Sequence, residues 1–227
     1  MTLYSSSHFE LAPLFQAVGD ALRQNQAALN QADTANGNHG DHMVEIFELA
    51  TRAAQEKAGL DLADAMLYAS QLLERVEQNG SAQLYGRGLA HIATQFRSHG
   101  VTLENLLPYV RKALAEQKET QPEGKSEDPA NSGMVLKALM TGLSAWEQAE
   151  SGKAVSERPL DMGVLFQFGM AYLQAKQRGG SRVEVIADAA VSVSPLSRTP
   201  HRYQSGKLAI QALLEAMQQA GGMRNLP

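Results

Sequence analysis

Apolar residues recur at helical spacing along most of this 227-residue chain, and this periodicity constrains the fold more than any other feature. In residues 9–29, for example, the apolar positions follow one another mainly at intervals of three or four. No strand–helix alternation, short repeat or cysteine pattern appears. We therefore expect an all-α protein with about eight helices in a single domain, residues 1–227.

Polar or glycine-containing segments separate the expected helices. Asp61 and Ser81 stand where N-cap residues would begin two of them. The expected helices span about 9–29, 43–54, 61–76, 81–96, 102–114, 134–149, 162–175 and 205–217. Residues 117–132 are rich in Glu, Lys, Pro, Gly and Ser, and we expect a mobile surface loop there. Residues 183–204 begin with a helical pattern, but two prolines favour an ordered, lid-like loop.

The composition excludes several classes of function. The formal net charge of −4 predicts no general attraction to nucleic acid. The lack of cysteine excludes disulfides, thiolate metal sites and a cysteine nucleophile. No apolar run is long enough to span a bilayer, and residues 1–9 do not resemble a signal peptide. We expect a cytoplasmic protein with no nucleic-acid or membrane partner.

Residues 33–43, Asp-Thr-Ala-Asn-Gly-Asn-His-Gly-Asp-His-Met, form the segment richest in potential ligand groups. Short carboxylate and amide side chains present oxygens to a hard cation such as Mg²⁺. A turn that precedes a helix N-terminus also suits phosphate groups. The alternative is an Asx-rich turn whose side chains bond their own backbone, and the residue types alone favour that alternative.

Two later segments offer groups to an anion. Gly80 and Ser81 could present amides and a hydroxyl at a helix start, although a serine N-cap after a glycine stop is the commoner explanation. Residues 192–206 and Lys207 bring basic groups, Arg198 among them, that could bind phosphate or fold over a base. The same groups could equally form a solvated surface.

The order and spacing of these segments resemble those of the L subunit of dihydroxyacetone kinases. That family has an LD…GDxDHGxNM loop after its first helix, followed by helix starts of the forms GGxSGxLYG, DKTMxD and DPGAxS. Residues 80–86, Gly-Ser-Ala-Gln-Leu-Tyr-Gly, keep the serine and the Leu-Tyr-Gly of the second motif. The progression covers essentially the whole chain.

The other motifs match less closely. Asp33 matches the leading aspartate of the loop, and either Asp41-His42 or residues 36–40 stand for the DxDHG portion. Gly133-Met134 keeps only the methionine of the third motif. Gln204-Ser205-Gly206 stands in the place of DPG, and Arg198 in the place of the family's loop arginine.

The resemblance implies a barrel of eight antiparallel helices. One mouth would bind ADP or ATP through Mg²⁺ ions, for phosphoryl transfer to dihydroxyacetone or a similar small triose held by a separate K-type substrate-binding subunit. The metal ligands carried over are Asp33, Asn36, Asn38 and Asp41. The nucleotide-binding residues carried over are His39, His42, Gly80, Ser81, Ala82, Met134, Arg198, Ser205 and Gly206.

Two departures from the family bear on this chemistry. Asn36 and Asn38 are amides, which coordinate but supply no charge, so we expect weaker metal binding or one ion in place of two. His39 and His42 could take Zn²⁺ instead, but Gly40 between them disfavours the helix that would align them. The alternative function is a non-catalytic relative acting as a nucleotide sensor, a partner-binding module or an apolar-ligand carrier.

Overall fold

The computed structural model describes residues 10–99 and 162–222, which contain only helices and connecting turns. The helices are α1 (Leu11–Gln24), α2 (Gln26–Ala32), α3 (His39–Glu56), α4 (Leu62–Glu74), α5 (Gly80–His99), α8 (Met162–Arg178), α9 (Arg182–Ser192), the 3-10 helix η1 (Pro195–Arg198) and α10 (Pro200–Gly222). The expected all-α fold is confirmed. The helices expected at 102–114 and 134–149, the loop expected at 117–132 and Met134 lie outside the described residues.

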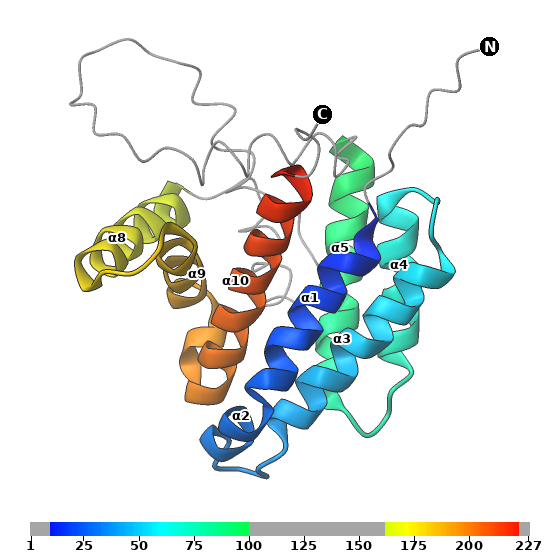
Figure 1. Cartoon of the computed structure of the whole chain (residues 1–227), viewed down its shortest axis with the longest axis horizontal. Helices are drawn as coiled ribbons and strands as arrows, with labels where there is room; N and C mark the ends of the chain where they lie inside the picture. Colours follow the sequence, from blue (N-terminus) through cyan, green and yellow to red (C-terminus); the bar gives the residue numbers. More distant parts are fainter. Residues whose placement is uncertain (1–9, 100–161, 223–227) are drawn as a thin grey trace.

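The helices form a bundle in which sequence neighbours pack side by side. Figure 1 shows α1, α3, α4 and α5 running alternately down and up, with α10 beside α1. Helices α8 and α9 lie on the far side of α10 from this group. None of the described helices is long and apolar enough to cross a membrane.

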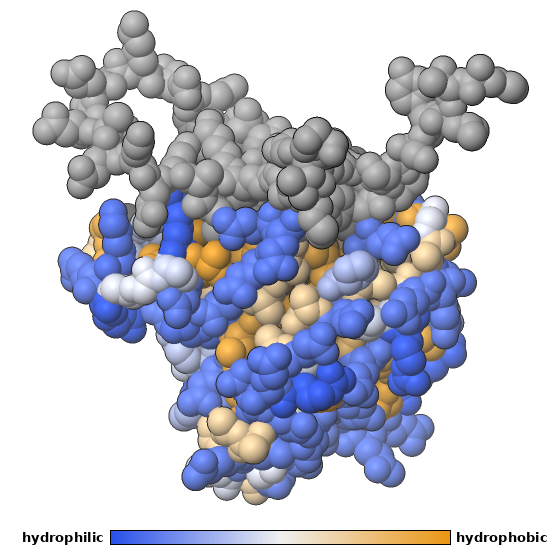
Figure 2. Space-filling view, in the orientation of Figure 1, coloured by the Kyte–Doolittle hydropathy of each residue, from blue (hydrophilic) through white to orange (hydrophobic). Residues whose placement is uncertain are grey.

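The predicted apolar faces form the core of the bundle. Five aliphatic side chains from α1 to α4 are at most 1% exposed and belong to one cluster: Leu22, Leu29, Met43, Ile46 and Leu73. Burying a side chain of this size contributes about 1.5–3 kcal/mol. Figure 2 shows hydrophilic residues over most of the visible described surface, with apolar groups in strips between them.

The helix expected over 9–29 is divided at Asn25. The Asn25 backbone amide donates to the Leu22 carbonyl at 3.1 Å, and its side chain donates to the Ala21 carbonyl at 2.8 Å. A short polar side chain of this kind competes with the regular helical hydrogen bonds. The chain therefore changes direction and starts α2 at Gln26.

Helix α3 begins at His39, four residues before the expected start, so the prediction that Gly40 disfavours a helix was wrong. A Cβ atom at position 40 would lie 2.3 Å from the Gln26 carbonyl oxygen. Glycine thus allows α2 and α3 to approach closely. Its low helix propensity, a cost of about 1 kcal/mol, is outweighed by this packing.

The lid-like loop expected at 183–204 is instead mostly helical. Helix α9 starts with a capping box in which Ser181 and Glu184 bond each other's backbone amides. Helix α10 starts at Pro200, where the missing amide proton of proline costs no helical hydrogen bond. Ser205 and Gly206 therefore lie within α10 and not at its N-terminus.

Candidate functional site

Three segments that are distant in sequence meet at the lower end of the bundle in Figure 1. We call this site the polar end and define it by Asp33, Asn38, His39, Asn79, His201 and Ser205. The first three come from the turn after α2 and the start of α3. Asn79 precedes α5, and the last two lie in the first turns of α10.

Asp33 bonds the backbone of its own turn. This is the arrangement expected if residues 33–43 form an Asx-rich turn and not a metal site. Its carboxylate accepts a hydrogen bond from the Ala35 amide at 3.1 Å and lies 3.8 Å from Nδ1 of His201. Burial alone would raise the pKa of Asp33. The Ala35 amide, His201 and the amides of the same turn outweigh burial and hold the pKa below its ordinary value. Asp33 is therefore a buried carboxylate that stays ionised at neutral pH.

His39 joins α3 to α10. Its Nε2 lies 2.9 Å from Oγ of Ser205, and its ring centroid is 4.6 Å from that of His201. The Ser205 hydroxyl donates to the Arg202 carbonyl at 3.2 Å, so Nε2 of His39 is the donor to Ser205. Burial, followed by the charge of His201, lowers the pKa of His39 to about 4 despite the opposing effect of Asp33. His39 is therefore neutral at pH 7.

Asn30 of α2, which the sequence analysis did not single out, caps α3. Its Oδ1 accepts from the amides of Gly40 at 2.7 Å and Asp41 at 3.2 Å. Its Nδ2 donates to Oδ1 of Asp41 at 2.8 Å, and Gln26 donates to the same oxygen at 2.7 Å. These bonds lower the pKa of Asp41. The Asp41 carboxylate and two of the amides expected to receive phosphate thus face α2.

Asn79, and not Ser81, caps α5. Asn79 is 1% exposed, and its Oδ1 accepts from the Ala82 amide at 3.0 Å. Its Nδ2 donates to the His42 carbonyl at 3.2 Å and to the Glu45 carboxylate at 2.8 Å. One buried amide group therefore fixes the start of α5 against the first turns of α3 and brings Gly80 and Ser81 to the polar end.

No family model, curated protein or solved structure matches this chain.

The remaining predicted residues vary in position. Asn36 is exposed in the turn, and Oδ1 of Asn38 is buried without a hydrogen-bond partner among the described residues. His42 is half-buried on α3, Arg198 is exposed at the end of η1, and Gly206 packs against Leu196.

Within residues 10–99 and 162–222, no three His, Cys, Asp or Glu side chains are grouped to hold a metal ion. The described residues alone thus do not supply a three-aspartate site.

The site was missed in part because its key contacts are tertiary. Asn30 and Asn79 look like ordinary helix-end residues in the sequence. Asn30 contacts residues 10 and 11 positions away, and Asn79 contacts residues 34 and 37 positions away. A local pattern carries no signal for such pairs.

Proposed function

We propose that this chain is a divergent relative of the L subunit of dihydroxyacetone kinases and binds ADP or ATP at the polar end. The supporting observation is that residues 33–39, 79–81 and 201–206 converge there. These are three of the four segments that carry the resemblance, and in the family they surround one nucleotide. The contacts of His39 with Ser205 and of Asn79 with α3 hold them together.

The groups of the polar end suit the phosphates of a nucleotide that brings its own Mg²⁺. Asp33 supplies an ionised carboxylate toward the cation. His201, whose side chain is 16% exposed, supplies ring nitrogens beside it. The first amides of α5, at Gly80 and Ser81, belong to a helix N-terminus, which favours anions. Phosphoryl transfer to a small triose held by a K-type partner requires chiefly positioning and charge neutralisation.

A second candidate is a non-catalytic module that keeps the bundle as a nucleotide sensor, a partner-binding surface or an apolar-ligand carrier. The hydrogen bonds of two asparagines favour it. Asn30 occupies the Gly40 and Asp41 amides, and Asn79 occupies the Ala82 amide, so several donors that could bind phosphate already have internal partners. The lack of a metal-holding group in the described parts of the chain points the same way.

Isothermal titration of the full chain with ADP, in EDTA and in millimolar Mg²⁺, separates these candidates. We expect magnesium-linked binding that Asp33→Asn weakens by about tenfold, because Asn keeps the Ala35 hydrogen bond but removes the charge. The matched control is Asp20→Asn on the exposed face of α1, which should bind ADP as the unaltered chain does.

Absence of heat in both conditions would exclude nucleotide binding. Binding that ignores both Mg²⁺ and the Asp33 substitution would overturn the magnesium-dependent proposal and support the sensor. Circular dichroism of Asp33→Asn confirms that the helices persist, so that lost binding is not mistaken for unfolding.

A further inference from the structure

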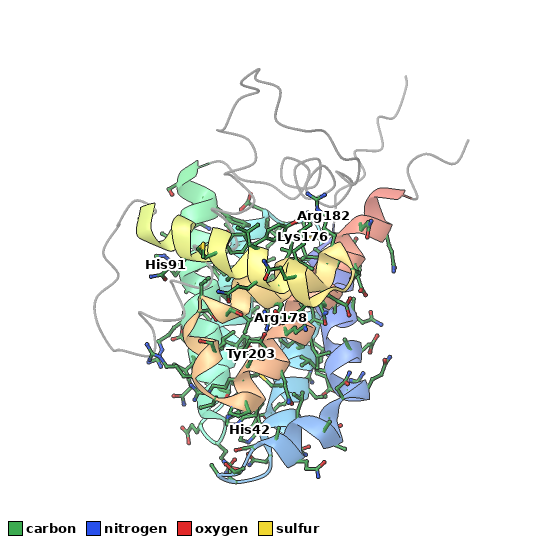
Figure 3. The ribbon with its side chains drawn as sticks, turned by 90° about the vertical axis from the view of Figure 1, so that its left-hand side faces the viewer. His42, His91, Lys176, Arg178, Arg182 and Tyr203 are labelled. Carbon is green, nitrogen blue, oxygen red and sulfur yellow. The ribbon has the colours of Figure 1, made fainter. Side chains whose placement is uncertain are left out.

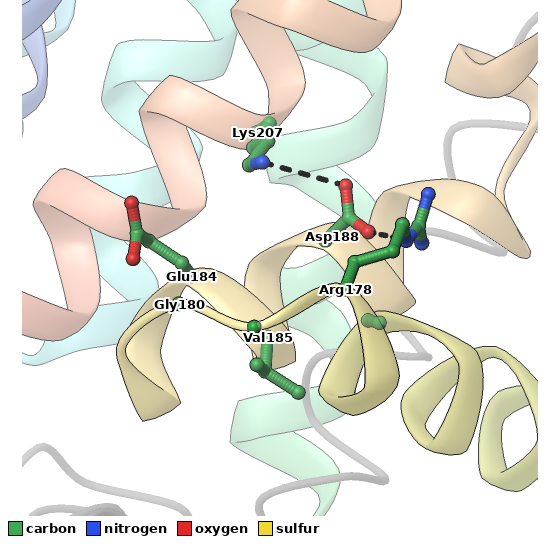
Figure 4. A pocket seen from close by; sticks show the side chains of 8 residues that line it. Arg178, Gly180, Glu184, Val185, Asp188 and Lys207 are labelled. Atoms are coloured by element: carbon green, nitrogen blue, oxygen red, sulfur yellow. Dashed lines mark hydrogen bonds and ion pairs between the residues drawn. The ribbon is translucent and has the colours of Figure 1, made fainter.

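A cavity of about 160 Å³ lies between the end of α8, the start of α9 and the side of α10. Figure 4 shows Arg178, Glu184, Asp188 and Lys207 around it. None of the residues that line this cavity belongs to the polar end, and Figure 3 shows Arg178 well above His42 of α3. Its walls carry two cations and two carboxylates, and neither the resemblance nor the proposed function uses any of them.

Asp188 organises the two cations. The residue is 7% exposed, and its carboxylate pairs with Nη2 of Arg178 at 2.5 Å and with Nζ of Lys207 at 3.5 Å. The Tyr203 hydroxyl donates to the same carboxylate. Two positive charges from α8 and α10 therefore share one buried negative charge from α9. Each cation is held at the wall of the cavity before any ligand arrives.

The second carboxylate, Glu184, is committed elsewhere. Its Oε2 accepts from the Ser181 amide at 2.6 Å as part of the capping box of α9. The Ser181 contacts lower the pKa of Glu184, so it stays ionised while bound to the backbone. Glu184 thus stabilises the start of α9 and accepts no hydrogen bond from Arg178 or Lys207 among the described contacts, although the charge of Lys207 also lowers its pKa.

Arg178 lines the cavity and has more donors than its contact with Asp188 uses. Its side chain is 60% exposed, and Asp188 is its one partner among the described residues. A guanidinium has five N–H donors and binds two oxygens of one planar or tetrahedral anion in a fixed geometry. The neighbouring Gly179 and Gly180 have φ of 82° and 117°, which side chains rarely adopt, so no Cβ atom narrows this edge of the cavity.

We propose that this cavity binds a small oxyanion, a carboxylate or phosphate group, between Arg178 and Lys207, with Asp188 as the internal counterion that holds both cations in place. The alternative is a purely structural ion-pair network joining α8, α9 and α10. The two explanations differ in one measurable respect. Only the first predicts saturable anion binding that depends on both cations.

The test is an amide NMR titration of the full chain with inorganic phosphate and, separately, with acetate, at constant ionic strength. We expect saturable shifts of the Gly179 and Gly180 amides, and the tighter-binding anion identifies the ligand class. Arg178→Gln and Lys207→Gln should each weaken binding by about tenfold or more. Arg23→Gln, which removes an exposed cation also paired with carboxylates, is the matched control and should leave binding unchanged.

Asp188→Asn provides a second, opposite readout. The amide removes the internal competitor for both cations, so anion affinity should rise, and phosphate should raise the melting temperature of this variant more than that of the unaltered chain. Shifts that do not saturate, or that persist in both Arg178→Gln and Lys207→Gln, would overturn the proposal. Loss of binding in His201→Gln alone would place the anion at the polar end, contradict the cavity site and leave the proposed function intact.

Discussion

Most polar side chains at and beside the polar end have hydrogen-bond partners within the chain. The Asn79 amide donates two hydrogen bonds and accepts one. The nearby Asn30 amide donates one to Asp41 and accepts two, from the amides of Gly40 and Asp41. The sequence predicted Asp33 as a metal ligand; the structure shows a buried carboxylate that accepts from the Ala35 amide, and the metal role stays a prediction. The sequence did not predict the partners of these side chains, because a side chain of given type bonds whichever group the fold brings near. Asn38 is the exception, because its buried Oδ1 has no hydrogen-bond partner among the described residues.

The depressed pKa of His39 predicts acid sensitivity. The unfolded chain binds a proton at His39 below pH 6.5, whereas the folded chain binds it only below about pH 4. Between these values protonation favours unfolding, so stability falls as the pH is lowered through this window and is unaffected by His39 above it. The expected loss is on the order of 2 kcal/mol after allowance for solvent screening.

Urea denaturation at pH 7 and pH 4.5 measures this effect. His39→Gln keeps a hydrogen-bonding group near Ser205 but cannot take up a proton, and it should reduce the difference between the two pH values. His42→Gln, three residues along α3, is the matched control and should retain the difference. An equal pH dependence in His39→Gln and the unaltered chain would show that His39 does not cause it.

At the scale of helices, capping residues and glycines predicted helix ends correctly where no tertiary contact competes with them. Asp61 caps α4 by accepting from the Ala63 amide, as expected, and Gly179-Gly180 follows the end of α8 with positive φ. The errors arose where tertiary contacts decide. Gly40 is helical because α2 packs on it, and α10 starts early because Pro200 suits a first turn. Periodicity identifies a helix better than it identifies its ends.

The start of α5 offers a direct test at this scale. Asn79→Ala removes the cap of α5 and leaves the His42 carbonyl without a side-chain donor, so we expect a loss of about 2 kcal/mol in the free energy of unfolding. Ser81→Ala should cost less than about 0.5 kcal/mol, because Ser81 does not cap the helix. Chemical denaturation of both variants measures the difference. A larger loss in Ser81→Ala would reverse the assignment of the cap.

At the scale of the whole molecule, the all-α class followed from periodicity alone. The packing order did not, because helical spacing shows which face of a helix is buried but not which helix covers it. Leu22, Leu29 and Leu73 each lie on a predicted apolar face, yet only the structure shows that they share one cluster. The described buried residues of this cluster come from six helices, α1 to α5 and α10.

That shared cluster predicts a large effect of a single truncation. Leu22 is fully buried, and Leu22→Ala should destabilise the chain by about 3 kcal/mol through lost burial and the cavity left behind. Leu60, which is 53% exposed, is the matched control, and Leu60→Ala should cost less than about 1 kcal/mol. Thermal and urea denaturation of the two variants measure the contrast. Similar losses in both would argue against a common core around Leu22.

Helix α10 makes two sets of attachments from nearly opposite sides. His201 and Ser205 face α3 and its preceding turn, whereas Tyr203 and Lys207 face Asp188 of α9. With 3.6 residues per turn, positions two apart point about 200° away from each other. Because α10 is held on opposite faces, it cannot rotate about its axis to shorten the contacts on one face without lengthening those on the other. The geometry of the imidazole pair and that of the shared aspartate are therefore mechanically linked through the axis of α10.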